Sequence, residues 1–180
     1  MNISTPNIQI SVLFDQDRLA SRVSALATEI IDEMGRDFLV IPVLKGSFIF
    51  AADLLRAMHL AGATPDMDFI TLSSYGASLQ SGGEVKILSD TEIKITGRHV
   101  LIVDDVLESG RTLSFARNLV MARHASSVKT CVLLEKPGKL AVQVKADFVG
   151  FECPDKFVAG YGMDVAHAWR QLPFVGVMEG

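Results

Sequence analysis

The chain has 180 residues, of which 49% are hydrophobic and 21% are charged, and these fractions are typical of globular proteins rather than of disordered or fibrous ones. A chain of this length suits one domain, so we expect a single domain over residues 1–180. Seventeen Lys and Arg against twenty-one Asp and Glu give a net charge of −4, which argues against binding to nucleic acid.

Neither membrane insertion nor secretion is indicated. The longest wholly apolar run, residues 38–44, is far shorter than the roughly 18–20 residues that span a bilayer, and the first residues do not resemble a secretory signal. Cys131 and Cys153 form no CxxC pair, so we expect two core thiols in a reducing compartment, the cytoplasm. A mean hydropathy of +0.32 indicates some apolar surface buried between subunits.

Strands and helices alternate along the chain, which predicts an α/β fold. Each expected strand is a short apolar run, and each expected helix shows apolar residues at three-and-four spacing. In chain order we expect a helix over 19–34, a strand over 38–44, a helix with Ser47 as its N-cap, a strand over 67–72, hairpin strands over 84–88 and 92–95, a strand over 99–103, a helix over 112–124, and strands over 128–134, 147–152 and 157–162. This order favours a mainly parallel sheet with a small strand-rich addition.

The segment SSYGASLQSGG, residues 73–83, differs in composition from its surroundings. It is rich in Ser and Gly, shows no periodicity and is long for a tight connection. Such composition is typical of a flexible lid over an active site, and an idle surface loop is the alternative.

The segment VLIVDDVLESGRTL, residues 100–113, carries the clearest chemical signal. A buried strand ends in Asp104 and Asp105, and a Ser-Gly loop then leads into a helix. Ligands of open α/β sheets bind beyond the carboxyl ends of the strands, and backbone N–H groups at a helix start hold phosphate. Carboxylates beside such a loop suit sugar hydroxyls or a divalent metal. The segment therefore predicts a site for a phosphorylated sugar, with a polar turn that binds nothing as the alternative.

Two other phosphate-binding motifs do not fit the chain. The sequence has no GxxxxGK[ST] phosphate loop. GYGMDV, residues 160–165, has two glycines of the dinucleotide fingerprint but Val165 in place of the third.

The same segment closely resembles the phosphoribosyl-pyrophosphate (PRPP) signature of type I phosphoribosyltransferases. Four more segments resemble the hypoxanthine-guanine branch of that family in order and spacing: VLKGSFIFAADL (43–54), SSYGASLQSGGEVKI (73–87), LLEKP (133–137) and the stretch from 149 to 177. The resemblance covers the chain from about residue 10 onward. It implies the type I phosphoribosyltransferase fold, a mainly parallel sheet flanked by helices, with a small strand-rich hood and a flexible lid loop.

The resemblance also implies which residues contact PRPP. Backbone N–H groups and hydroxyls would hold the 5′-phosphate, two acids would hold the ribose, and three segments would meet the pyrophosphate. The expected residues are Glu108, Ser109, Gly110, Arg111 and Thr112 for the phosphate; Asp104 and Asp105 for the ribose; and Lys45 and Gly46, next to a cis Leu44–Lys45 peptide, with Arg170 and the lid residues Ser74 and Tyr75, for the pyrophosphate.

A purine site and a metal are implied in the same way. Phe157 would stack on the purine and the Val158 backbone would face its pairing edge. Lys136 would donate to the oxygen at C6, which selects 6-oxopurines over adenine because adenine presents a donor there. Mg²⁺ is the implied cofactor, with candidate ligands Asp104, Asp105 and Asp164.

The implied reaction is displacement of pyrophosphate from the anomeric carbon of PRPP by purine N9. Glu108, Lys45 and Arg170 are the expected catalytic residues, with Glu108 as the base. The family usually has Asp where this chain has Glu108, and the added methylene matters because a misplacement of about 1 Å costs on the order of a hundredfold in rate.

These implications lead to one hypothesis and two alternatives. The leading hypothesis is a purine-salvage enzyme that makes inosine monophosphate, and also guanosine monophosphate, from PRPP. The alternatives are a xanthine-preferring transferase and a PRPP- or nucleotide-sensing regulator on the same fold. The expected partners are PRPP and a 6-oxopurine, without nucleic acid or membrane, and the family usually forms homodimers or homotetramers.

Overall fold

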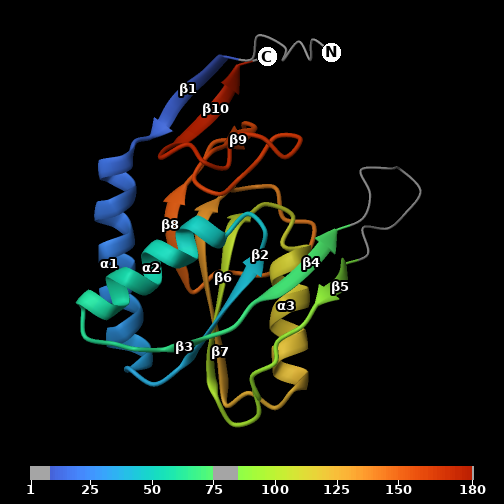
Figure 1. Ribbon diagram of the computed structural model, residues 1–180. Coiled ribbons are helices and arrows are strands. Elements are labelled where there is room, and N and C mark those ends of the chain that lie inside the picture. The colour runs from blue at the N-terminus through green and yellow to red at the C-terminus, as the bar shows by residue number, and fades with distance from the viewer. Residues whose placement is uncertain (1–8, 75–84, 180) are drawn as a thin grey trace, which may run out of the picture.

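The computed structural model describes residues 9–74 and 85–179, and its strands form two sheets (Figure 1). The larger sheet has the strand order β5-β4-β2-β6-β7-β8, with β3 paired to β2. All its pairs are parallel except β4 with β5, which confirms the mainly parallel sheet. Its strands are β2 (Leu39–Leu44), β3 (Asp66–Met67), β4 (Ile70–Ser74), β5 (Val85–Ser89), β6 (His99–Leu107), β7 (Ser127–Glu135) and β8 (Phe148–Glu152).

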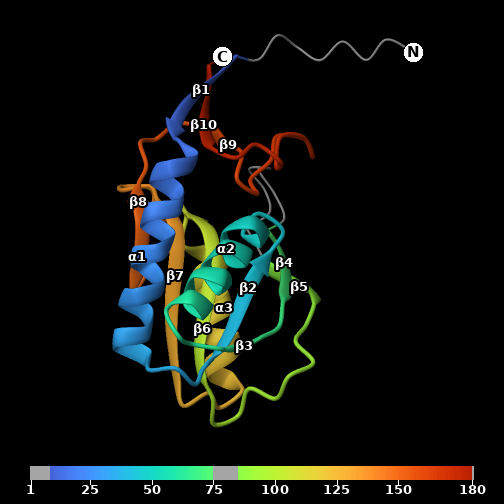
Figure 2. The ribbon, with the colours of Figure 1, turned by 60° about the vertical axis from the view of Figure 1, so that its left-hand side comes forward.

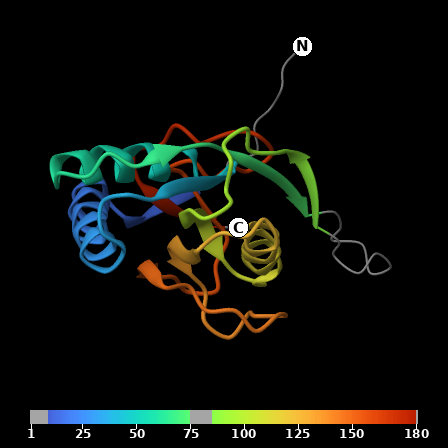
Figure 3. The same cartoon turned by 90° about the horizontal axis from the view of Figure 1, so that it is seen from below.

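Helices lie on both faces of this sheet, as the view from below shows (Figure 3). Val40 and Leu101 pack in one core cluster with α1 and α2, whereas Ile41 and Ile102 pack in a second cluster with α3. Successive side chains of a strand point to opposite faces, so a strand covered on both sides is apolar throughout. The helices are α1 (Gln16–Met34), α2 (Phe48–Leu60) and α3 (Arg111–Ala122).

The first residues of α1 and α2 differ in whether a side chain caps the helix. The Asp15 carboxylate caps α1 by accepting from the Arg18 backbone N–H at 2.8 Å, and Gly35 ends the helix with φ +79°. Ser47 precedes α2 as expected, but its buried hydroxyl donates to the Val43 carbonyl at 2.6 Å. Ser47 is therefore the N-cap residue, as predicted, but its side chain makes no capping hydrogen bond to the helix.

A second, antiparallel sheet forms the expected hood beyond the carboxyl ends of the parallel strands (Figure 2). β1 (Gln9–Phe14) pairs with β10 (Val175–Glu179), and β10 pairs with β9 (Val158–Ala159). The hood therefore joins the two ends of the described chain. Its strand β9 begins at Val158, which is one of the residues expected to face the purine.

The predicted hairpin over 84–88 and 92–95 is wrong. β5 pairs with β4 instead, and residues 92–95 form no strand. The Asp68 carboxylate accepts the backbone N–H groups of Glu92 and Ile93, at 2.6 and 3.0 Å, and Ile95 is buried in the core. These contacts replace the hydrogen bonds that a hairpin would make. The strand predicted over 67–72 is divided between β3 and β4 around the same Asp68.

The strand predicted over 157–162 is confined to β9 because three successive residues adopt left-handed backbone conformations. Gly160, Tyr161 and Gly162 have φ of +95°, +50° and +104°. A Cβ at Gly160 would lie 2.2 Å from the Phe174 carbonyl oxygen, so glycine is required there. The glycines of the GYG segment serve this turn.

Both cysteines are buried, as predicted, and burial raises the pKa of the Cys131 thiol. None of the helices in residues 9–74 and 85–179 combines the length and apolar character that crossing a membrane requires.

We expect Asp68→Ala to lower the free energy of unfolding by about 2 kcal/mol, because the carboxylate accepts hydrogen bonds from three backbone N–H groups, those of Phe69, Glu92 and Ile93. Partial burial opposes a low pKa, but these hydrogen bonds outweigh it and hold the pKa of Asp68 below its usual value of 3.8. The contribution is therefore complete above pH 3.8 and is lost as pH falls through the lowered value.

Urea denaturation at pH 7 measures this change. The matched control is Asp66→Ala, which removes a mostly exposed partner of Arg98 and should cost less than about 1 kcal/mol. Equal losses in the two variants would contradict the role given to Asp68.

Candidate active site

Two carboxylates lie near the carboxyl end of β6, that of Asp104 buried and that of Asp105 partly buried. The strand continues to Leu107 and does not end at Asp104 and Asp105 as predicted, because it stays paired with β7 as far as Glu135. Asp104 is only 5% exposed. Burial raises the pKa of both carboxyls, and the charge of Asp105 raises that of Asp104 further.

The turn after β2 lies directly against these acids. The Leu44–Lys45 peptide is cis, as the resemblance implied. A Cβ at Gly46 would lie 1.6 Å from Asp105 Oδ2, so any larger residue would displace the carboxylate. Gly46 thus lets the backbone after β2 approach the end of β6, while the Lys45 side chain is exposed.

A tight loop joins β6 to α3. The Ser109 carbonyl accepts the backbone N–H groups of Ala141 and Val142, at 2.9 and 3.2 Å, and Gly110 has φ +77°. The helix begins at Arg111, one residue before the predicted start. The first N–H groups of a helix have no partner within the helix, so Arg111 and Thr112 begin a turn suited to an anion.

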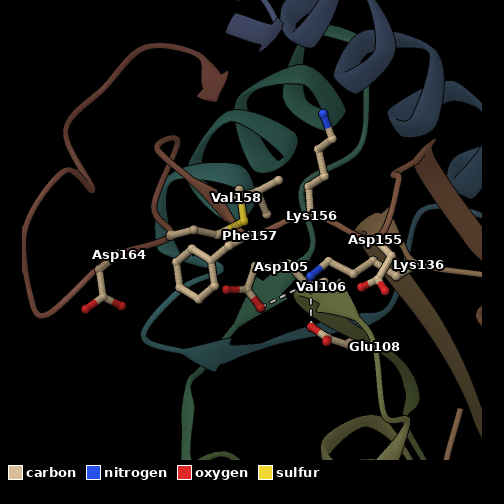
Figure 4. A pocket seen from close by; sticks show the side chains of 10 residues that line it. Asp105, Val106, Glu108, Lys136, Asp155, Lys156, Phe157, Val158 and Asp164 are labelled. Atoms are coloured by element: carbon tan, nitrogen blue, oxygen red, sulfur yellow. Dashed lines mark hydrogen bonds and ion pairs between the residues drawn. The ribbon is translucent and has the colours of Figure 1, made fainter. Parts of the chain in front are cut away.

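A cavity of about 360 Å³ opens between the end of β6 and the hood (Figure 4). Its lining combines acids, lysines and an aromatic ring from three separate parts of the chain. The lining residues are Asp105, Val106, Glu108, Lys136, Asp155, Lys156, Phe157, Val158, Met163 and Asp164. The structure therefore brings together Asp105, Glu108, Lys136 and the hood residues that were predicted separately, whereas Asp104 is not among the residues of this lining.

Glu108 and Lys136 point toward one another in this cavity (Figure 4). Glu108 Oε2 lies 3.0 Å from Lys136 Nζ. The Lys136 backbone N–H also donates to the Leu107 carbonyl at 2.9 Å, which holds the residue after β7 against the end of β6. The Lys136 side chain is 7% exposed and that of Glu108 is 50% exposed, so the pair offers a buried donor and an accessible acceptor.

Phe157 presents an apolar ring at the cavity and is 59% exposed. Its carbonyl accepts the Met178 backbone N–H at 3.0 Å, which fixes its backbone to β10. Val158, the first residue of β9, is buried. An exposed ring anchored by a strand is suited to stack on a flat ligand. The Lys156 side chain points away from the other side chains drawn (Figure 4).

Asp164 is held at the edge of the cavity by two partners. Arg170 Nη2 lies 2.7 Å from Asp164 Oδ1, and the His167 backbone N–H donates to Oδ2 at 2.7 Å. Arg170 also donates to the Gly162 carbonyl at 2.8 Å. Carboxylate and guanidinium thus form one unit that follows the left-handed turn.

No group of three or more His, Cys, Asp and Glu in residues 9–74 and 85–179 is arranged to hold a metal ion by itself. Mg²⁺ commonly takes one or two carboxylates and completes its shell with substrate oxygens and water. Asp104, Asp105 and Asp164 fit that mode of binding, in which the substrate supplies most ligands.

The remaining expected site residues are Ser74 and Tyr75, which belong to the predicted lid. Ser74 is the last residue of β4. Tyr75 and the rest of the expected lid, through residue 83, lie outside the described residues.

Sequence reasoning missed several residues that the structure places at the site. Val106, Asp155, Lys156 and Met163 line the cavity, and no pattern in the sequence marks them. The stretch from 149 to 177 contains the last three, so the resemblance pointed to their neighbourhood without selecting them.

Comparisons with known proteins agree with this arrangement. The family model described as "Phosphoribosyl transferase domain" matches residues 9–166. The hypoxanthine-guanine phosphoribosyltransferase of Bacillus subtilis is 43% identical over 169 residues, which cover 93% of this chain and 92% of that protein. The bifunctional protein TilS/HprT of Listeria monocytogenes is 42% identical over 179 residues, and the chain spans only 27% of its length.

The fold is also similar to that of solved structures. The crystal structure of a hypoxanthine-guanine phosphoribosyltransferase from Bacillus anthracis gives a TM-score of 0.87 at 39% identity, with 97% of this chain and 100% of that chain covered. The chain therefore belongs to the phosphoribosyltransferase family, in its hypoxanthine-guanine branch.

Proposed function

We propose that the protein is a purine-salvage enzyme that transfers the phosphoribosyl group of PRPP to N9 of hypoxanthine, and of guanine, with release of pyrophosphate. The observation that carries this proposal is the Glu108–Lys136 pair, 3.0 Å apart in a cavity beside the exposed ring of Phe157. Two relatives that cover 93% of the chain are named for hypoxanthine, and one of them also for guanine, which supports the same substrates here.

The purine end of the site follows from donor and acceptor chemistry. In its N7–H tautomer a 6-oxopurine presents an oxygen at C6 and an N–H at N7 along one edge, so that edge can meet both an ammonium and a carboxylate. Lys136 would donate to the oxygen and Glu108 would accept from the nitrogen, while Phe157 stacks on the ring. Adenine has an amino group at C6 and would face the ammonium with a second donor.

The PRPP end uses the segments that follow β2 and β6. The loop from Glu108 to Thr112 would hold the 5′-phosphate with N–H groups and the hydroxyls of Ser109 and Thr112. Asp104 and Asp105 would bind the ribose hydroxyls. The backbone around Gly46, with Lys45, Arg170, Ser74 and Tyr75, would contact the pyrophosphate.

Asp104, Asp105 and Asp164 would hold Mg²⁺ together with oxygens of PRPP. When bound, the cation neutralises charge on the leaving pyrophosphate. Arg170 adds a fixed positive charge next to Asp164, 2.7 Å away, and orients that carboxylate.

In the proposed reaction the bond from the anomeric carbon to pyrophosphate oxygen breaks and the bond to purine N9 forms. As the bond to N9 forms, the purine loses the proton on N7, which Glu108 accepts. Lys45 and Arg170 stabilise the negative charge that develops on pyrophosphate. Holding the two substrates next to one another in one cavity would provide the remaining part of the rate acceleration.

The direct test is pyrophosphate release from PRPP and Mg²⁺ with hypoxanthine, guanine, xanthine or adenine in turn. We expect release with hypoxanthine and guanine and none with adenine. A clear preference for xanthine would support the first alternative. No release with any base, despite measurable binding of PRPP or a nucleotide, would reject the enzyme and support the regulator.

We also propose a cytoplasmic location and a homodimer or homotetramer, because the hydropathy is high for a monomer and the branch usually assembles in this way. Sedimentation of the purified chain would give the subunit number.

Lys136→Met should lower kcat/KM for hypoxanthine about a hundredfold or more, because the oxygen at C6 loses its donor. Adenine is not expected to be a substrate, so its effect is measured as inhibition, and its inhibition constant should not rise in the same proportion. The matched control is Lys139→Met, which removes a nearby lysine that pairs with Asp155. Steady-state kinetics with hypoxanthine as substrate and adenine as inhibitor measure both changes, and parallel changes would show that Lys136 does not read C6.

Glu108→Gln should lower kcat at least a hundredfold, because an amide keeps the length of the side chain but cannot take up the purine proton. Glu108→Asp keeps the carboxylate but withdraws it from Lys136, so we expect a smaller fall of about tenfold. Single-turnover rates with hypoxanthine separate chemistry from product release. Full activity in the Gln variant would remove Glu108 from the mechanism.

Asp104→Asn should raise the melting temperature and weaken PRPP binding. Asp104 is buried beside Asp105, so its charge is unfavourable in the free protein and a neutral amide relieves both desolvation and repulsion. Differential scanning calorimetry at pH 7.5 and PRPP titration measure the two effects. A lower melting temperature would contradict this view of the acidic pair.

A further inference from the structure

The turn that carries Asp164 and Arg170 is tied to α2 by one side-chain hydrogen bond. The Tyr161 hydroxyl donates to Asp53 Oδ2 at 2.7 Å, across 108 positions of the chain. Tyr161 is 6% exposed, and burial, with this hydrogen bond, raises the pKa of its phenol, so the phenol keeps its proton. The other oxygen of Asp53 accepts from Arg56 at 2.8 Å.

The same turn touches the loop after β2 on its other side. A Cβ at Gly162 would lie 2.2 Å from the Gly46 carbonyl oxygen, so the two backbones are in direct contact there. The Gly162 N–H donates to the Arg170 carbonyl at 2.9 Å, and Arg170 returns a hydrogen bond to the Gly162 carbonyl. A shift of Tyr161 would therefore move Gly162 and Arg170 together.

Tyr161 packs in the core cluster with α1 and α2, but open space borders its hydrogen bond to Asp53. A cavity of about 270 Å³ lies beside the hydrogen bond, between α1, α2 and the hood. Its lining includes both Asp53 and Tyr161, and the other lining residues are Gln16, Leu19, Ala20, Ile49, Gln171, Leu172 and Pro173. Because side chains leave space on that side, the directional hydrogen bond adds a constraint on the position of the turn.

We propose that Asp53 is a positioning residue for the pyrophosphate end of the site. Through Tyr161 it holds the turn that carries Asp164 and Arg170 against the loop of Lys45 and Gly46, although it lies on α2 and does not line the cavity of Glu108 and Lys136. This inference rests on the proposed function, because it places the leaving pyrophosphate between these two segments.

The test measures binding of Mg²⁺-pyrophosphate by calorimetry, together with the KM values for PRPP and hypoxanthine. In Tyr161→Phe, which lacks only the hydroxyl, we expect affinity for Mg²⁺-pyrophosphate to fall about tenfold. The KM for PRPP should rise in parallel, and the KM for hypoxanthine should stay within about twofold of the original, because the Glu108–Lys136 pair is not attached to this turn.

Variants of Asp53 make the argument specific. Asp53→Ala should match Tyr161→Phe, and the double variant should be no weaker than either, because both remove one bond. Asp53→Asn keeps an acceptor oxygen and should restore most of the affinity. Arg56→Gln is the matched control, since it removes the other partner of Asp53 and should bind as the unaltered protein does.

The outcomes separate the inference from the proposed function. Loss of thermal stability in Tyr161→Phe and Asp53→Ala with unchanged Mg²⁺-pyrophosphate affinity would overturn the inference and leave the enzyme intact. Weakened affinity in those variants would uphold the inference even if the unaltered protein transferred no phosphoribosyl group. An unaltered protein that does not bind Mg²⁺-pyrophosphate would overturn it.

Discussion

The parallel pairing of β6 with β2 on one side and β7 on the other decides where the proposed contacts lie. Parallel strands end at the same edge of a sheet, so the segments that follow them meet there. The turn at Lys45 follows β2, Glu108 follows β6, and Lys136 follows β7. This register also places Gly46 against Asp105, where no side chain would fit. The sheet thus brings these segments together at one edge, and the hood lies beyond that edge (Figure 2).

The parts of the fold that the sequence predicts are those whose signal is local. The helix over 19–34 and the strands at 99–103 and 128–134 form because apolar spacing and burial agree. β1 and β10 escaped prediction, since each is stabilised by a partner at the far end of the chain. The hairpin at 92–95 failed because Glu92-Ile93-Lys94-Ile95 alternates like a strand, while a distant carboxylate takes its N–H groups.

The candidate site divides in the same way. The segment 100–113 was readable because acids, loop and helix start follow one another in sequence. The contact of Asp53 with Tyr161 was not, because a helix and a turn 108 positions apart must first be brought together. The GYG segment gave a partial signal. Its glycines indicated an unusual backbone conformation, but not the reason for it. The structure shows that Gly162 allows the backbone of this turn to contact the Gly46 carbonyl.

The Glu108 carboxylate has two roles in this account: it neutralises the buried Lys136, and it is proposed to accept the purine proton. Lys136 is only 6% exposed, and a buried ammonium without a partner is costly because it loses its water. Glu108 reaches it from the end of the neighbouring strand at 3.0 Å. The residue proposed to take the purine proton is thus also the partner of the buried lysine that is proposed to contact the oxygen at C6. In the proposed complex the purine oxygen at C6 would take the place of Glu108 as a partner of Lys136. Base recognition and proton transfer would then both depend on the Glu108 carboxylate.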